Sequence, residues 1–130
     1  MNKKGKLKIT LIGSGGRMGV SITQILANST KSILFAAVER ANSPLIGKDI
    51  GLNAGIGENG VLFTSHTEEA IAGCDVVIDF GSAENSKSVL DLAAKYNKPL
   101  VIGVTGLDES FLQRIKELSV QFPILQSPNM

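Results

Sequence analysis

The chain has 130 residues and a formal net charge of +1, and it is 43% hydrophobic and 19% charged. This balance is typical of one globular domain and, with no basic cluster beyond residues 3–6, it argues against a nucleic-acid surface. Because no apolar run approaches the roughly eighteen residues of a membrane span, and the basic start leads into a strand pattern rather than a signal peptide, we expect a cytoplasmic protein with no membrane contact.

The first predicted elements surround a glycine cluster. Residues 1–6 are expected to form a flexible tail, the apolar run over 8–12 predicts a buried strand, and the pattern over 20–27 predicts a helix. The glycine-rich segment 13–19 lies between the strand and the helix. This order is typical of a dinucleotide-binding unit, because a pyrophosphate can approach the backbone N–H groups at a helix start only where no Cβ intervenes.

The glycine spacing departs from the usual dinucleotide-binding pattern. Gly13 and Gly15 fit the first two positions of G-x-G-x-x-G, but Met18 stands in the sixth position and Gly19 follows one residue late. Read with Gly16, the cluster fits G-x-x-G-x-x-G instead. A tight turn with only a structural role is the alternative, and the flanking strand and helix favour nucleotide binding.

A second apolar run, over 33–38, predicts another strand covered on both faces, and it ends at Glu39 and Arg40. Glu39 follows the glycine cluster by about twenty residues, the spacing at which an acidic side chain binds the adenosine ribose hydroxyls. Arg40 can pair with the 2′-phosphate of NADP, so the two residues predict use of both cofactors, and a surface pair without function is the alternative. The long, glycine-rich segment 41–60 is expected to be a functional flap or a mobile loop.

The next segment predicts a short strand over 61–64 and a helix start capped by Thr67. The only histidine, His66, lies in the loop before this helix and is not expected to act as a catalytic acid. The only cysteine, Cys74, cannot form an intrachain disulfide and is interpreted as a packed, unreactive thiol. One imidazole and one thiol do not complete a metal-ligand set, so no metal site is expected.

A strand predicted over 76–80 ends in Asp79 and Phe80. Asp79 could act as a general base, but hydrogen bonding to nearby backbone N–H groups is the favoured interpretation. Phe80 is expected either to flank the adenine or nicotinamide of a cofactor or to lie in the core. Ser82 is the expected cap of a helix over 83–96, whose apolar face comprises Val89, Leu92, Ala93 and Tyr96.

The last elements are a strand over 100–103, a helix capped by Asp108 and a strand beginning at 123–126. The apolar side of that helix is expected to comprise Leu112, Ile115, Leu118 and Phe122. The alternation of strands and helices predicts an α/β fold with a Rossmann-type, doubly wound, mostly parallel sheet in a single domain. Ligands of such a sheet bind at the carboxyl ends of its strands.

The turn after the strand over 100–103 is a candidate for the nicotinamide end of a cofactor. Gly103 and Gly106 bracket Val104 and Thr105, so the backbone can approach a flat ring closely. The Gly103 carbonyl or the Thr105 hydroxyl could hold a carboxamide or a substrate carboxylate. A plain turn is the alternative.

These segments together resemble a known family. The motifs Gly13-Ser14-Gly15-Gly16-Arg17-Met18-Gly19, Glu39-Arg40, Val77-Ile78-Asp79-Phe80, Val101-Ile102-Gly103-Val104-Thr105-Gly106 and Ser127-Pro128-Asn129-Met130 are similar to those in the N-terminal domain of 4-hydroxy-tetrahydrodipicolinate reductase, formerly called dihydrodipicolinate reductase. The resemblance runs from about Leu7 to Met130. Residues 7–130 are therefore interpreted as a dinucleotide-binding domain.

The resemblance implies a role for each motif. Gly13, Ser14, Gly15, Gly16, Arg17 and Met18 would bind the pyrophosphate of NADPH or NADH, Glu39 the adenosine ribose, and Arg40 the 2′-phosphate of NADPH. Gly103, Val104 and Thr105 would contact the nicotinamide, beside which Phe80 is also a candidate, and Thr105 would lie near the substrate. Ser127, Pro128, Asn129 and Met130 would close over the nicotinamide.

The resemblance also implies a reaction. Enzymes of this family reduce a cyclic unsaturated dicarboxylate to tetrahydrodipicolinate on the diaminopimelate route to lysine, and the full-length protein is expected to be a homotetramer. The catalytic acid, a histidine, and a nearby lysine belong to a second domain that this chain does not contain. We therefore expect the chain to bind cofactor without catalysing the reaction.

Two departures and two alternatives accompany this interpretation. Where the family commonly has D-F-T-x-P, this chain has Gly81 and Ala83 in place of the threonine and the proline, and Val104 replaces the first threonine of G-T-T-G. These changes put side-chain contacts from those positions in doubt.

Two other functions are compatible with the predicted fold. A non-catalytic nucleotide-sensing module, or the cofactor domain of another two-domain dehydrogenase acting on sugars or amino acids, would share the fold.

Overall fold

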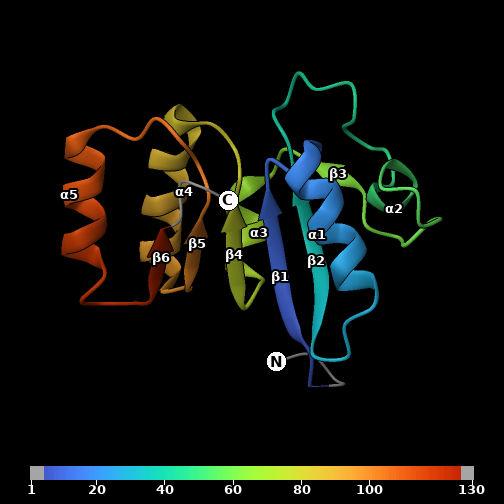
Figure 1. Cartoon of the computed structure of the whole chain (residues 1–130), viewed down its shortest axis with the longest axis horizontal. Helices are drawn as coiled ribbons and strands as arrows, with labels where there is room; N and C mark the ends of the chain where they lie inside the picture. Colours follow the sequence, from blue (N-terminus) through green and yellow to red (C-terminus); the bar gives the residue numbers. More distant parts are fainter. Residues whose placement is uncertain (1–4, 127–130) are drawn as a thin grey trace.

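The structure is a computed structural model and describes residues 5–126 of the chain. Within this part the strands form one six-stranded sheet in the order β3–β2–β1–β4–β5–β6, in which every neighbouring pair is parallel (Figure 1). The strands are β1 Leu7–Ile12, β2 Ser32–Val38, β3 Phe63–Thr64, β4 Val76–Asp79, β5 Leu100–Ile102 and β6 Ile124–Gln126. This order is that of a doubly wound, Rossmann-type sheet, which confirms the predicted fold class.

Helices cover both faces of the sheet (Figure 1). They are α1 Arg17–Ala27, α2 Ile50–Asn53, α3 Thr67–Ala72, α4 Ala83–Tyr96 and α5 Glu109–Leu118. One hydrophobic layer packs α1 and α2 against β1 and β2, and the other packs α3, α4 and α5 against β4 and β5. Leu11 and Ile12 are neighbours in β1 and both are fully buried, because they belong to opposite layers. Burial on both faces explains why the strands are continuous apolar runs.

The segment 41–60 has an internal order that the prediction of a flap or mobile loop missed. The Asp49 carboxylate accepts hydrogen bonds from four backbone N–H groups, those of Gly51, Leu52, Asn59 and Gly60, at 2.7–3.2 Å. Two of these N–H groups lie in the first turn of α2, and the other two belong to residues 59 and 60, eight residues further along the chain. One buried carboxylate therefore closes the loop on itself and caps α2.

Two predicted caps are confirmed and one is wrong. The Ser82 hydroxyl accepts from the Asn85 N–H at the start of α4, and the Asp108 carboxylate accepts from the Phe111 N–H at the start of α5. Thr67 is instead the first residue of α3, and its hydroxyl donates back to the Ser65 carbonyl at 3.5 Å. The N-cap position is occupied by His66, whose side chain makes no capping hydrogen bond.

The buried faces of α4 and α5 differ in part from the predicted ones. Val89 and Ala93 are buried as predicted, but Leu90 is buried as well, because α4 packs against α3 and α5 in addition to the sheet. In α5 the prediction for Leu112 was wrong: it is 39% exposed and Phe111 takes its place in the core. None of the helices in residues 5–126 is long and apolar enough to cross a membrane. The predicted flexible tail lies mostly outside the described residues.

Candidate functional site

Backbone hydrogen bonds connect the carboxyl ends of four neighbouring strands, β2, β1, β4 and β5. The N–H of Gly13, which follows β1, donates to the Val38 carbonyl at the end of β2 at 3.0 Å. The Phe80 N–H, after β4, donates to the Ile12 carbonyl at 2.9 Å, and the Gly103 N–H, after β5, donates to the Asp79 carbonyl at 2.9 Å. The glycine turn, the turn after β4 and the turn after β5 therefore form one contiguous edge.

Two adjoining cavities open along this edge. The first has a volume of about 590 Å³ and the second about 370 Å³. Both are lined by Gly13, Gly16, Phe80, Gly81 and Ser82. The first cavity extends toward the ends of β2 and β3, and the second toward the turn after β5. A ligand with two linked halves can therefore lie across the glycine turn with one half in each cavity.

Gly13 and Gly19 are required by the packing of the turn. Gly13 has φ +74°, and a Cβ on it would lie 2.7 Å from the Phe80 carbonyl and from the Gly81 nitrogen. A Cβ on Gly19 would overlap the Ser14 backbone. The first contact lets the glycine turn lie directly on the turn after β4, and the second lets α1 pack directly against the segment that enters it.

The first turn of α1 carries backbone N–H groups that have no acceptor among the described residues. Gly16 is the N-cap and has no side chain, and no acidic residue lies in the first turn of the helix. The N–H groups of Arg17 and Met18 have no acceptor among the described residues, as expected for the first turn of a helix. Because the helix dipole is also positive here, this is a site for an anion such as a pyrophosphate.

Ser14 points away from this anion site. It is fully buried, and its hydroxyl donates to the Val38 carbonyl at 3.1 Å. Its N–H also donates to that carbonyl, at 3.3 Å. The hydroxyl of the predicted contact Ser14 therefore holds the turn to the end of β2.

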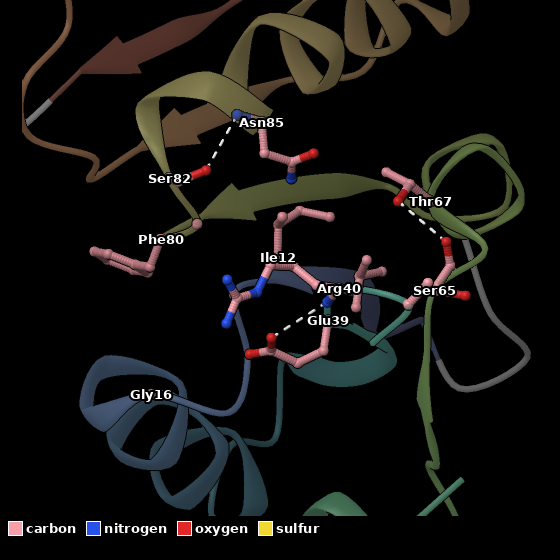
Figure 2. A pocket seen from close by; sticks show the side chains of 13 residues that line it. Ile12, Gly16, Glu39, Arg40, Ser65, Thr67, Phe80, Ser82 and Asn85 are labelled. Atoms are coloured by element: carbon pink, nitrogen blue, oxygen red, sulfur yellow. Dashed lines mark hydrogen bonds between the residues drawn. The ribbon is translucent and has the colours of Figure 1, made fainter. Parts of the chain in front are cut away.

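Glu39 and Arg40 both line the first cavity. One Glu39 oxygen, Oε2, accepts the Gly15 N–H at 2.8 Å, and the other, Oε1, accepts the Arg40 N–H at 3.3 Å. Figure 2 shows the Arg40 side chain extended into the cavity. The structure thus brings the predicted ribose acceptor and the predicted phosphate partner into the same cavity as the glycine turn.

Asp79 has the structural role that the sequence favoured. It is fully buried, and its two oxygens accept from the Gly81 N–H at 2.8 Å and from the Ser86 hydroxyl at 2.6 Å. Burial raises the pKa of the Asp79 carboxyl above its usual value, and the bonds from Ser86 and Gly81 oppose this only in part. Asp79 therefore fixes the turn that both cavities share.

Phe80 lies against Gly103, so closely that a Cβ on Gly103 would overlap the ring. The second cavity is also lined by Arg17, Met18, Gly103, Val104 and Thr105. Val104 is 4% exposed, so its side chain packs inward, whereas Thr105 is exposed. The predicted contacts Ser127, Pro128, Asn129 and Met130 lie outside the described residues.

Three polar residues that the sequence did not indicate as ligand contacts also line the first cavity. Ser65 and Thr67 follow β3, and Asn85 lies in the first turn of α4. Figure 2 shows these side chains around the cavity, opposite the glycine turn. The rule that ligands bind at strand ends could have indicated Ser65, but no residue-type signal distinguishes Asn85 from an ordinary surface residue.

Neither His66 nor Cys74 lines either of these two cavities. His66 is exposed and sits 3.9 Å from the Glu69 carboxylate. Cys74 is 1% exposed, its thiol donates to the Ile71 carbonyl, and burial raises the pKa of the thiol, which confirms a packed thiol. In residues 5–126 no group of three or more histidine, cysteine or acidic residues is arranged to hold a metal.

Comparisons with known proteins agree with this geometry. A family model described as dihydrodipicolinate reductase, N-terminus, matches residues 7–130. The chain is 38% identical over 124 residues to the 4-hydroxy-tetrahydrodipicolinate reductase of Syntrophus aciditrophicus and 40% identical over 123 residues to that of Desulfotalea psychrophila. Each match covers 95% of this chain and 46% of the relative. The chain thus spans about half the length of these relatives.

A solved structure has the same fold. The dipicolinate-bound dihydrodipicolinate reductase from Paenisporosarcina sp. TG-14 superposes with a TM-score of 0.75 at 20% identity. The match covers 95% of this chain and 48% of that protein. The fold that the two proteins share therefore accounts for about half of the solved relative.

Proposed function

Because the chain belongs to the family of dihydrodipicolinate reductase N-terminal domains, we propose that its two adjoining cavities bind NADPH or NADH for the reduction carried out by the full-length protein. The observation that carries the proposal is the start of α1, where Gly16 lines both cavities and the N–H groups of Arg17 and Met18 have no acceptor among the described residues. A dinucleotide has a pyrophosphate at its centre, so its anionic part matches this position.

Each half of the cofactor has suitable residues in one cavity. Glu39 can accept from the hydroxyls of the adenosine ribose, and the Arg40 guanidinium can pair with a 2′-phosphate. On the other side, Gly103 and Thr105 present backbone and hydroxyl groups to a carboxamide. When bound, the nicotinamide cofactor supplies a hydride. The residues of this chain bind and orient it.

The substrate belongs to the full-length protein in this proposal. The reductases to which the chain is similar act, by name, on 4-hydroxy-tetrahydrodipicolinate, and the solved relative holds dipicolinate. We propose the same cyclic dicarboxylate as substrate, with exposed Thr105 beside it at the open end of the second cavity. A proton donor and cationic partners for the carboxylates would come from the other half of the protein. The proposal includes the homotetramer that the resemblance implies and the cytoplasmic location expected from the sequence.

Calorimetric titration of this chain with NADPH and with NADH, at one fixed salt concentration, tests cofactor binding. We expect saturable binding of at least one of them. Gly16→Ala is a suitable variant because a Cβ there would have only the Gly13 oxygen nearby, at 3.9 Å, yet Gly16 lines both cavities. The variant should unfold at the same temperature as the wild type and bind at least about tenfold more weakly. Wild-type protein that binds neither dinucleotide would overturn the proposal.

The reaction itself is tested by a chimera. The second half of the Desulfotalea psychrophila relative, joined after this chain, would supply the part that the chain lacks. Reduction of the dicarboxylate by the chimera, and none by this chain alone, is the expected result. A chimera that binds cofactor and yet turns over a sugar or an amino acid instead would favour a different dehydrogenase.

A further inference from the structure

The Glu39 carboxylate is bonded to the glycine turn itself. Glu39 and Gly15 are 24 residues apart in sequence, and Oε2 accepts the Gly15 N–H at 2.8 Å. A Cβ on Gly15 would lie 2.9 Å from the same oxygen and 2.5 Å from Cδ1 of Leu45. A side chain at Gly15 would therefore have to displace the ends of the Glu39 and Leu45 side chains. In Figure 2 the Glu39 carboxylate points toward the turn that leads into α1.

This bond completes the internal hydrogen bonding of the turn. The N–H groups of Gly13 and Ser14 donate to the Val38 carbonyl, and that of Gly16 makes a long 3.5 Å bond to the Gly13 carbonyl. With Gly15 committed to Glu39, the N–H groups left for an anion are those of the first helical turn. The Glu39 carboxylate therefore accepts the N–H of residues 13–16 that is not bonded to a backbone carbonyl in the described part of the chain.

We propose that Glu39 is a positioning residue for the phosphate site, acting through the Gly15 N–H, in addition to any contact with the ribose. The inference rests on the proposed function, since it assumes that a pyrophosphate binds at the start of α1. It differs from the ribose role in one respect that can be measured. A ribose contact alone has no effect on a ligand without ribose hydroxyls, whereas a positioning residue affects any ligand with a pyrophosphate.

Two variants of Glu39 separate these roles. Glu39→Gln keeps an oxygen that can accept the Gly15 N–H, and Glu39→Ala does not. Both remove the same negative charge, so their comparison cancels the electrostatic effect on a bound phosphate. Glu58→Gln, at an exposed loop position away from both cavities, controls for the change in net charge. The probe is 2′,3′-dideoxy-ADP, which has a pyrophosphate and lacks both ribose hydroxyls.

The first readout is hydrogen exchange of the Gly15 amide in ¹⁵N-labelled chain without ligand. We expect exchange at wild-type rates in Glu39→Gln and Glu58→Gln, and exchange about fivefold faster in Glu39→Ala, the effect of one ordinary hydrogen bond. The second readout is the affinity for dideoxy-ADP by chemical-shift titration. Glu39→Ala should bind about fivefold more weakly than Glu39→Gln. Circular dichroism confirms that each variant is folded, and if Glu39→Ala does not fold, Glu39→Asn replaces it, because its side chain is one methylene shorter than that of glutamine and equally uncharged.

Equal dideoxy-ADP affinities in Glu39→Ala and Glu39→Gln would overturn the positioning role, whether or not the exchange of Gly15 differs. This failure is distinguishable from failure of the proposed function, which would appear as wild-type protein that binds neither NADPH nor NADH.

Discussion

Replacement of Asp79 by alanine should destabilise the protein strongly, because the carboxylate holds two groups at the centre of the site. The variant removes the acceptor of the Gly81 N–H at 2.8 Å and of the Ser86 hydroxyl at 2.6 Å. Hydrogen bonds to a charged group contribute about 1.5–3 kcal/mol each, and the cost of burying the carboxylate offsets part of their sum. We expect the free energy of unfolding to fall by about 2–4 kcal/mol.

Urea denaturation at pH 7 measures this loss. Asp79→Asn is the matched control, since its amide keeps an acceptor for Gly81 and can donate to the Ser86 oxygen, and it should cost about 1 kcal/mol or less. Ser86→Ala should lose less than Asp79→Ala, and the double variant should lose less than the sum, because both single changes break the same bond. An Asp79→Ala protein within about 1 kcal/mol of wild type would refute the assignment of a structural role.

The same carboxyl makes stability depend on pH. Its pKa in the folded protein is raised by burial, so the folded state binds a proton more tightly than the unfolded state does. The stability from this proton is fully present below the ordinary carboxyl pKa of about 3.9 and is lost as the pH rises through the raised value. Relative to Asp79→Asn, wild-type protein should therefore lose stability across this window. A constant difference between the two proteins over that range would contradict the raised pKa.

Three further predictions concern other parts of the molecule. Arg40→Ala should weaken NADPH binding by about tenfold more than NADH binding in calorimetry, and equal weakening would exclude a 2′-phosphate contact. Thr105→Val should weaken NADH binding but not ADP binding, because Thr105 lines the second cavity and not the first, where the ADP half of the cofactor is proposed to lie; loss of both would contradict this placement. Burial raises the pKa of the Asp49 carboxyl more than any single backbone hydrogen bond lowers it, but the four bonds together bring the pKa below its ordinary value. Its contribution to stability is therefore present above the ordinary carboxyl pKa and lost as the pH falls through the lowered value. In urea denaturation at decreasing pH, the free energy of unfolding of Asp49→Asn should therefore fall less than that of the wild type.

The sequence was informative where the fold restricts the residue type. Gly13 must be glycine because of its positive φ and its contact with the turn after β4, so the cluster around it is visible as a motif. Glu39 was predicted to lie near the glycine turn because the βαβ unit sets the distance between the ends of the first two strands. Ser82 and Asp108 were found as caps because their partners lie three residues away. Each of these constraints acts over a short, regular stretch of chain.

Contacts between distant, irregular segments were not predictable in this way. Asp49 in the sequence is an ordinary loop residue, and only the folded loop shows that it accepts N–H groups ten and eleven residues later. The approach of Leu45 to Gly15 likewise depends on the path of a loop with no periodicity. The error at Leu112 has a related cause, because the side of α5 that faces the core is set by how the helix packs on α4 and β5, which its own pattern does not specify.

The same distinction separates two regions of the proposed nucleotide site. The proposed phosphate region is built from backbone groups, and a ligand can approach a backbone this closely only at glycine, so the sequence reveals it. The far side of the first cavity is built from Ser65, Thr67 and Asn85, polar side chains that many other residues could replace without disturbing the fold. These residues line the cavity together with Arg40, so they can influence which base or ribose substituent it accepts. Differences in cofactor preference between this chain and its relatives should accordingly map to these positions and to Arg40, while changes in the glycine turn should weaken binding of every nucleotide.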